Sequence, residues 1–214
     1  MNLLTLPGVF APISDSWLLA DAIRQEDLGP GSRALDVCTG SGVLALTAAS
    51  CGAETTAVDV SRRALLTVRL NAIRHGVHVR TLRGQTFAPV AGERFDLIVS
   101  NPPYVPSPRT DLPRRGPSRA WEAGRTGRIV LDALCDAAPA HLRPGGVVLL
   151  VSSSLIGTDL TLDRLRNAGL VEVEVRTSVR GPLGPLMRAQ QKAGTIPAEI
   201  DHEDVVVIRA VGPS

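Results

Sequence analysis

The chain has 214 residues, of which 44% are hydrophobic and 21% are charged, and its formal net charge is +2. This composition is typical of a globular protein with one buried core, so we expect a single domain over residues 1–214. The longest uninterrupted apolar run, residues 147–151, is too short to cross a bilayer, and no leader pattern is evident. A cytoplasmic protein without membrane association is therefore expected.

The net charge and the cysteines bear on three classes of protein: those that bind polyanions, those with disulfide frameworks and those with metal sites. A net charge of +2 gives little long-range attraction for a polyanion, although a local cluster could still bind one. The three cysteines, Cys38, Cys51 and Cys135, are far apart and form no Cys-x-x-Cys pair. Neither a disulfide framework nor a metal site is expected.

After an N-terminal segment over residues 1–32, short apolar runs alternate with segments of helical period. Such alternation predicts βαβ units and a parallel sheet. Ser61 and Thr158 fit helix N-caps, and Gly76 and Gly169 fit helix ends. The strands are expected over residues 34–37, 55–60, 77–82, 95–100 and 147–152, and the helices over 42–51, 61–74, 127–141 and 158–168.

Two more strand-like runs, residues 171–179 and 204–211, follow the last of these helices. No full βαβ crossover separates them, which favours an antiparallel pair. The predicted fold is therefore α/β and Rossmann-like. It has a mostly parallel seven-stranded sheet, helices on both faces and an antiparallel C-terminal strand pair.

Two segments match no regular element. Residues 105–119 contain four prolines and several arginines, and proline keeps a connection stiff and non-helical. A long loop beside a candidate site is usually functional or disordered, and we interpret this one as a substrate loop. Residues 181–202 form an insertion between the last two strands, with a short helix expected over 186–193.

The first predicted strand ends in Asp36-Val37-Cys38-Thr39-Gly40-Ser41-Gly42 and runs directly into a helix. Glycines at such a turn let the backbone bend tightly and approach a ligand, while the helix N-terminus offers free N–H groups. Dehydrogenases and methyltransferases share this pattern, and a tight turn without a ligand is the alternative.

Acidic and amide side chains follow the next two strands. Asp59 closes the second strand 23 residues after Asp36, where a carboxylate can accept hydrogen bonds from ribose hydroxyls. Asp59 could instead cap the helix that begins near Ser61. The preceding glycine turn favours the interpretation that Asp59 binds ribose. In Gly84-Gln85-Thr86, after the third strand, Gln85 could accept from an adenine amino group or be a solvated loop residue.

Asn101-Pro102-Pro103-Tyr104 stands at the carboxyl end of the fourth strand. The Asn101 side-chain oxygen and the Pro102 carbonyl can each accept one N–H from a substrate –NH2 group. Neither proline adds a competing donor, and Tyr104 offers a flat face for a planar amide or base. A simple turn is the alternative, but the glycine turn earlier in the chain favours a catalytic role.

With these motifs the chain resembles the class I methyltransferases, and specifically the HemK-like family of glutamine methyltransferases that modify peptide-chain release factors. Residues 8–19, Gly-Val-Phe-Ala-Pro-Ile-Ser-Asp-Ser-Trp-Leu-Leu, are similar to the segment with which short family members cover the cofactor. Residues 118–128 resemble the Gly- and Arg-containing stretch after the family's catalytic loop. The resemblance extends through about Val179.

The resemblance implies a class I methyltransferase fold, with S-adenosylmethionine as methyl donor and S-adenosylhomocysteine as product. It places the catalytic chemistry on Asn101, Pro102, Pro103 and Tyr104. It implies cofactor contacts from Asp15, Ser16, Asp36, Cys38, Thr39, Gly40, Gly42, Asp59, Val60, Gly84, Gln85, Thr86 and Asn101.

The sequence departs from the family pattern at two positions and in the length before the first strand. Cys38 stands where the family usually has glycine, and Gln85 stands where an acidic residue normally meets adenine. Both residues retain workable chemistry, and a weaker cofactor affinity is expected from Gln85. About 32 residues precede the first strand, as in the shorter eukaryotic and archaeal type. Members of that type work with a small zinc-binding activator protein.

Several acceptors share the planar –NH2 chemistry. The first hypothesis is a protein glutamine, in a release-factor-like Gly-Gly-Gln context, and the second is adenine N6 or guanine N2 of RNA or DNA. Six arginines over residues 105–128 could contact phosphate, although a solvated loop explains them better, and no segment is long enough for a separate base-recognition domain. A small molecule held under residues 181–202 is the third hypothesis. An inactive binding module is disfavoured because Asp59, Asn101 and Pro102 are all present.

Overall fold

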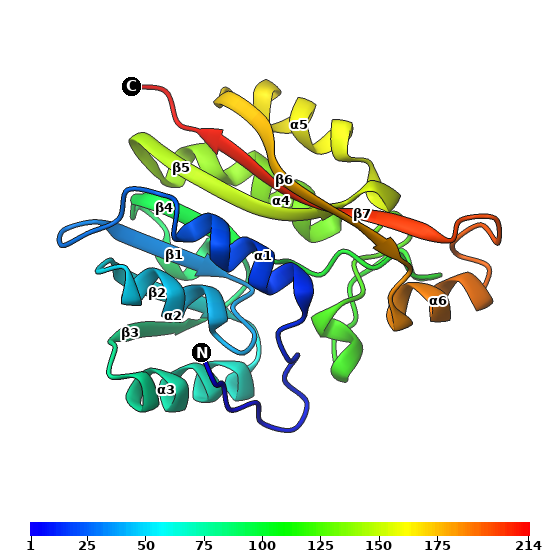
Figure 1. The fold of residues 1–214 in the computed structure, drawn as a ribbon, viewed down its shortest axis with the longest axis horizontal. Coiled ribbons are helices and arrows are strands. Elements are labelled where there is room, and N and C mark those ends of the chain that lie inside the picture. Colours follow the sequence, from blue (N-terminus) through cyan, green and yellow to red (C-terminus); the bar gives the residue numbers. More distant parts are fainter.

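Seven strands form one sheet in the order β3-β2-β1-β4-β5-β7-β6 in the computed structural model, which describes residues 1–214 (Figure 1). Strands β1 to β5 are parallel, and β7 pairs antiparallel with both β5 and β6. This topology confirms the predicted fold class. The strands are β1 (Arg33–Val37), β2 (Glu54–Asp59), β3 (Val79–Arg83), β4 (Phe95–Ser100), β5 (Leu142–Ser153), β6 (Val171–Pro182) and β7 (His202–Val211).

Helices cover both faces of the sheet (Figure 1). Three helices, α1 to α3, pack on one face, and α4 and α5 pack on the other. The four predicted crossover helices are all present. The helices are α1 (Ser14–Ile23), α2 (Val43–Ser50), α3 (Arg62–His75), α4 (Ile129–Ala137), α5 (Thr158–Asn167) and α6 (Pro185–Lys192), and the short 3-10 helices are η1 (Ala88–Val90), η2 (Pro117–Ala120), η3 (Ala138–His141) and η4 (Ser154–Ile156).

Successive residues of the central strands serve two separate cores. Leu35 and Ile98 belong to the core beneath α4 and α5, whereas Ala34 and Leu97 belong to the core beneath α1 and α2. All four side chains are fully buried. Because neighbouring strand residues point to opposite faces, a one-residue slip would exchange the two cores, and the register is fixed.

Helix ends agree with the predictions in part. Ser61 caps α3, where its Oγ accepts from the Ala64 N–H at 3.3 Å, and Gly76 ends that helix with φ +66°. The prediction for Thr158 is wrong, because Gly157 is the N-cap of α5 and Thr158 is already helical. Gly169, with φ +91°, directly follows Ala168, the C-cap residue of α5.

Helix α1 is not among the predicted elements. Its N-cap residue, Ile13, makes no side-chain capping bond, so the usual start signal is missing. The helix is held by packing, since Leu19, Ala20 and Ile23 are buried against α2 and the sheet. Tertiary contacts therefore stabilise a segment whose local sequence gives little indication of a helix.

The insertion between β6 and β7 supports the loop that follows β4. It contains α6, which agrees closely with the predicted short helix. Leu183, Met187 and Ile196 pack against Val105 in a small separate core. The insertion therefore lies behind the turn at residues 101–104, which follows β4.

Strands β1 and β4 end side by side where the strand order reverses. Val37 and Ser100 are register partners, and Ser100 Oγ donates to the Val37 carbonyl at 2.6 Å. The turns that follow these strands therefore start from adjacent positions, at the kind of switch point where open α/β sheets bind ligands. None of the helices has both the length and the apolar content that a membrane span requires.

Candidate active site

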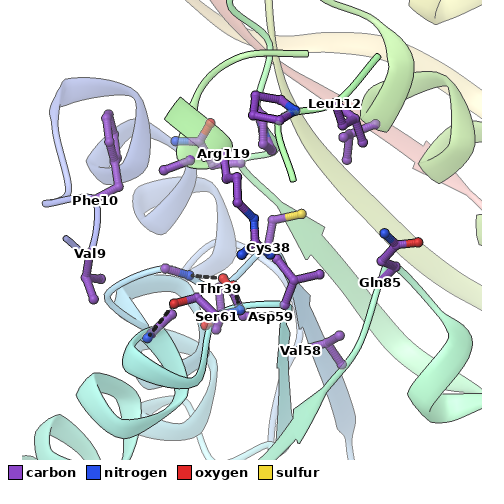
Figure 2. Close-up of a pocket in the computed structure, with 18 of the residues that line it drawn as sticks. Val9, Phe10, Cys38, Thr39, Val58, Asp59, Ser61, Gln85, Leu112 and Arg119 are labelled. Carbon is purple, nitrogen blue, oxygen red and sulfur yellow. Dashed lines mark hydrogen bonds between the residues drawn. The ribbon is translucent and has the colours of Figure 1, made fainter. Parts of the chain in front are cut away.

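A cavity of about 960 Å³ opens at the carboxyl edge of the sheet (Figure 2). The turns after β1, β2, β3 and β4 form one side of it, and residues 8–12, residues 110–120 and the start of α4 form the other walls. This is a common size for a cofactor pocket. The predicted site residues that line it are Ser16, Cys38, Thr39, Gly40, Asp59, Val60, Gly84, Gln85, Thr86, Asn101 and Pro103.

The turn after β1 has three residues with left-handed backbone. Cys38, Gly40 and Gly42 have φ values of +62°, +52° and +88°. At Gly42 a Cβ would approach Val68 Cγ2 to 2.9 Å, so this glycine serves helix packing and does not line the cavity. At Gly40 a Cβ would meet no atom closer than 3.9 Å, and the open space there faces the cavity.

Asp36 is buried behind this turn and does not line the cavity. Its Oδ2 accepts from Thr39 Oγ1 at 2.6 Å and from the Ala45 N–H at 3.0 Å, while its Oδ1 has no partner. Burial raises the pKa of Asp36 to about 7, against the opposing effect of those two hydrogen bonds. The residue therefore holds the shape of the turn from below.

Asp59 ends β2 and faces the cavity beside the glycine turn (Figure 2). Its Oδ1 accepts from the Ser61 N–H at 2.8 Å, and its Oδ2 accepts from the Gly40 N–H at 3.0 Å. A carboxylate has about four lone-pair directions, so each oxygen keeps one for a ligand hydroxyl. Burial raises the pKa of Asp59, and the amide N–H groups and the charge of Arg119 oppose that rise.

The turn after β3 is tightly built. A Cβ at Gly84 would come within 2.2 Å of Pro89 Cγ, and Thr86 has φ +42°. Gln85 reaches the cavity from this turn (Figure 2). Its position on the wall agrees with a ligand contact and leaves the adenine assignment a prediction.

The Asn-Pro-Pro-Tyr motif divides between the cavity wall and the interior. Asn101 and Pro103 line the cavity, whereas Pro102 and Tyr104 do not. The Tyr104 hydroxyl donates to Asp15 Oδ2 at 2.9 Å, and its ring packs against the hydrophobic cores. The expected flat face of Tyr104 is therefore not on the cavity wall, because an acid of α1 and apolar neighbours hold the ring.

Residues 121–127, which follow the loop, hold the turn at residues 101–104 in place. Val105 N donates to the Trp121 carbonyl at 2.8 Å, and Ala123 N donates to the Val105 carbonyl at 3.0 Å. At Gly127, where φ is +72°, a Cβ would lie 2.5 Å from the Tyr104 carbonyl oxygen. Residues 121–127 thus form a backbone support that only glycine permits at its closest point.

The arginines of residues 105–128 have different roles in the structure. Arg119 extends into the cavity above Cys38 and Asp59 (Figure 2). Arg128 is buried, donates to the Ile156 carbonyl at 2.7 Å and forms an ion pair of 2.7 Å with Asp132. The remaining four, Arg109, Arg114, Arg115 and Arg125, are exposed.

Sequence reasoning does not identify some residues of the wall. Arg119 and Leu112 come from the irregular loop, which carries no periodic signal that would indicate their direction. Val9 and Phe10 belong to the N-terminal segment that the family resemblance singles out, and the phenyl ring lies 6.5 Å from the Trp121 ring. The loop and the N-terminal segment thus meet beside the cavity.

The cavity residues fit S-adenosylmethionine. Asp59 has unused lone pairs for ribose hydroxyls, Gln85 has an amide for adenine, and Val58 and Phe10 supply apolar surface. Arg119 would place a positive charge near the carboxylate of such a ligand. No group of three His, Cys, Asp or Glu side chains is arranged to hold a metal ion.

Residues 1–112 match the family model of the methyltransferase small domain. A protein of Methanocaldococcus jannaschii with the provisional name protein N5-glutamine methyltransferase is 30% identical over 185 residues, covering 85% of this chain and 90% of that protein. The release factor glutamine methyltransferase of Deinococcus radiodurans is 40% identical over 171 residues, covering 77% of this chain. The alignment spans 60% of the length of that enzyme and 54% of the length of the Gloeobacter violaceus enzyme of the same name.

Solved structures share the fold at low sequence identity. A Pyrococcus furiosus methyltransferase has a TM-score of 0.66 at 19% identity, covering 100% of this chain and 90% of that one. The 16S rRNA N2 G1207 methyltransferase of T. thermophilus, in complex with AdoMet and guanosine, has a TM-score of 0.67 at 23% identity, covering 97% and 46%. With the sequence matches, these findings show that the chain belongs to the methyltransferase small domain family and is an S-adenosylmethionine-dependent methyltransferase of the HemK-like group.

Proposed function

We propose that the protein methylates the side-chain amide nitrogen of a glutamine in a protein acceptor, such as a peptide-chain release factor. The observation that carries the proposal is the position of Asn101, beside the glycine turn and on the wall of the cofactor cavity. Relatives at 30% and 40% identity are named for the same reaction, which supports the choice of glutamine.

The chemistry requires a weak nucleophile to be prepared for attack, because the lone pair of an amide nitrogen is delocalised. When bound, S-adenosylmethionine supplies an electrophilic methyl group on a positively charged sulfur. No hydrogen bond within the protein uses Asn101 Oδ1 or the Pro102 carbonyl oxygen, so each can accept one amide N–H. Holding both N–H bonds favours a more tetrahedral nitrogen with an available lone pair. As the N–CH3 bond formed, the bond between the methyl carbon and the sulfur would break, and the nitrogen would release one of its two protons.

Methylation of a nucleic-acid base is the second candidate. The exposed Arg114, Arg115 and Arg125 form no ion pair and lie in the loop region beside the cavity, where they could contact phosphate. A base also presents a planar –NH2 group. The two candidates differ in the acceptor and in its sensitivity to nuclease.

The test of the function uses labelled S-adenosylmethionine with a release factor, with the same factor carrying Gln→Glu in its Gly-Gly-Gln motif, and with bulk RNA. We expect labelling of the parent factor only, unaffected by nuclease, with mass spectrometry placing the methyl group on that glutamine. The assay is run with and without a small zinc-binding activator, the partner that the family resemblance implies. Label that appears on RNA instead would replace this proposal with the second candidate.

The role of Asn101 makes a quantitative prediction. In Asn101→Ala the single-turnover rate should fall by roughly a hundredfold to a thousandfold, because one preorganised acceptor is lost from the transition state. Affinity for S-adenosylhomocysteine and the melting temperature should change little. Asn101→Asp is the matched control, since it keeps size and an acceptor oxygen, and it should retain partial activity. A stable Asn101→Ala variant that methylates at the parent rate would refute the mechanism.

A further inference from the structure

The first turn of α1 reaches the catalytic turn through a chain of side-chain hydrogen bonds. Asn101 Nδ2 donates to Ser16 Oγ at 3.1 Å, and Ser16 Oγ donates to Asp15 Oδ1 at 3.2 Å. The Tyr104 hydroxyl donates to the other carboxylate oxygen, Asp15 Oδ2, at 2.9 Å. Both ends of the Asn-Pro-Pro-Tyr turn are thus tied to one acid that lies more than 80 residues away in the sequence.

The direction of these bonds follows from the groups that can donate. A carboxylate offers only acceptors, so the single hydrogen of the Ser16 hydroxyl is directed to Asp15. Ser16 Oγ then has only lone pairs left for Asn101, which must present its –NH2 group. The Asn101 carbonyl oxygen consequently points away from Ser16 and stays free for an acceptor N–H. The opposite amide orientation would place two acceptors against each other.

The Asp15 carboxylate, at the centre of this hydrogen-bond network, is buried and fully hydrogen-bonded. Asp15 is 3% exposed and Ser16 is 5% exposed. Asp15 Oδ1 also accepts from the Ser16 backbone N–H at 2.6 Å, so three donors serve the carboxylate. Loss of one of these donors would leave a buried carboxylate without a hydrogen bond, which is energetically costly. The positions of Ser16 and Tyr104 around Asp15 are therefore fixed.

Tyr104 remains a donor throughout the ordinary pH range. Burial raises the pKa of Tyr104, and the nearby charges of Asp15 and Glu203 raise it further. The phenol therefore keeps its proton and its bond to Asp15. This bond anchors the backbone three residues after Asn101.

We infer that Ser16 and Asp15 are positioning residues, which set the amide orientation of Asn101 and anchor Tyr104 so that the turn presents two acceptors to the methyl-accepting nitrogen. The inference rests on the proposed function, which gives Asn101 its acceptor. It differs from the cofactor contacts that the family resemblance implies for both residues. Asp15 does not line the cavity, and its carboxylate is already occupied by three protein donors.

The kinetic test compares Ser16→Ala with Ser16→Thr, which keeps the hydroxyl. At saturating cofactor, Ser16→Ala should lower the single-turnover rate by about tenfold to a hundredfold, because the Asn101 amide loses its support, while Ser16→Thr should stay close to the parent. Affinity for S-adenosylhomocysteine should stay within about twofold in both variants. A variant that loses cofactor affinity and keeps the saturated rate would show that Ser16 is a cofactor ligand and would overturn the inference.

A double-mutant cycle separates positioning from a direct role. If Ser16 acts only through Asn101, then Ser16→Ala should have no further effect on the rate in an Asn101→Ala background. Additive losses in the double variant would contradict the inference. Melting temperatures measured in parallel identify any variant that is merely unfolded.

A spectroscopic test needs no methyl acceptor. The chain has four asparagines, Asn2, Asn71, Asn101 and Asn167, so selective 15N-asparagine labelling gives few side-chain amide signals. The Asn101 signal is identified by its loss in Asn101→Ala. It should shift in Ser16→Ala and in Asp15→Asn and return in Ser16→Thr. The Asn71 amide, which donates to Leu4 and Ser41 carbonyls, serves as the internal reference.

The single tyrosine provides the matching measurement for Asp15. Tyr104 is the only tyrosine of the chain, so an absorbance titration reports its ionisation alone. Asp15→Asn should lower the pKa of Tyr104, because it removes both a negative charge and an acceptor. Unchanged Asn101 and Tyr104 signals in the variants would refute the positioning role. A parent enzyme that methylates no glutamine acceptor, with these shifts present, would refute the proposed function alone.

Discussion

Cys38 occupies a backbone conformation that favours glycine. Its φ of +62° lies in the left-handed region, which glycine adopts without strain. A side chain in that region costs about 1 kcal/mol or more. The sulfur lies on the cavity wall (Figure 2), where burial, with the charges of Asp59 and Asp36 adding to it, raises the pKa of the thiol. The residue is therefore a strained, protonated side chain on the wall of the cavity.

The strain at Cys38 predicts an unusual order of stabilities. At most buried positions glycine is less stable than alanine, whereas here Cys38→Gly should be more stable than Cys38→Ala by about 1 kcal/mol. Both variants lose the thiol, so the comparison isolates the backbone conformation. Urea unfolding of the two variants measures the difference. An alanine variant that is as stable as the glycine variant would show that the turn carries no strain.

Among the elements, the segment at residues 121–127 approaches the backbone of the Asn-Pro-Pro-Tyr turn most closely at Gly127. Gly127→Ala would place a Cβ 2.5 Å from the Tyr104 carbonyl oxygen and 2.8 Å from Ile156 Cγ2. We expect a loss of more than about 2 kcal/mol in the free energy of unfolding, together with a lower turnover as the turn at residues 101–104 shifts. The measurement combines urea unfolding with single-turnover rates.

Gly76 is the matched control for this prediction. It ends α3 in a left-handed backbone with φ +66° and ψ 27°, does not line the cavity, and a Cβ there would meet no atom within 4 Å. Gly76→Ala should therefore carry only the backbone cost of about 1 kcal/mol and leave turnover close to the parent. Equal losses in the two variants would mean that the close approach of residue 127 to Tyr104 is unimportant.

The sequence predicts the elements whose signals are local. Strand β4 is predicted with its observed ends, and β1, β2, α2 and α3 within a residue or so, because apolar runs and glycine stops define them. Helix α1 has no such signal, since its stability comes from packing against α2 and the sheet. Thr158 shows the same limit on a smaller scale, because the turn at Gly157 displaces the cap by one residue.

The sequence could predict those residues of the candidate site that lie at the ends of strands. Asp59 and Asn101 line the cavity because their strands end at one edge of the sheet. The direction of Tyr104, the entry of Arg119 into the cavity and the burial of Arg128 depend on contacts with distant segments. No local pattern carries that information, so the sequence could not distinguish a solvated arginine from a buried one.

At the scale of the whole molecule, Asp36 affects both the free energy of unfolding and the shape of the glycine turn at the site. This residue lies near the end of β1 and supports the glycine turn through Thr39 and Ala45, yet its Oδ1 has no hydrogen-bond partner. Burial raises its pKa from 3.8 to about 7. The folded protein therefore favours the neutral acid. As the pH rises, Asp36 loses its proton at a lower pH in the unfolded chain than in the folded protein.

The sign of the resulting pH dependence follows from this order. The contribution of Asp36 to stability is fully present below about pH 4 and is lost as the pH rises through 7. Asp36→Asn cannot ionise, so the stability of the variant relative to the parent should rise by about 3 kcal/mol between pH 5 and pH 8. Urea unfolding of both proteins at several pH values measures this difference. The other titrating groups are common to both and cancel in the comparison. Parallel stability profiles across that range would mean that Asp36 is ionised in the folded protein at pH 5, and a neutral Asp36 could then not be the group that supports the glycine turn.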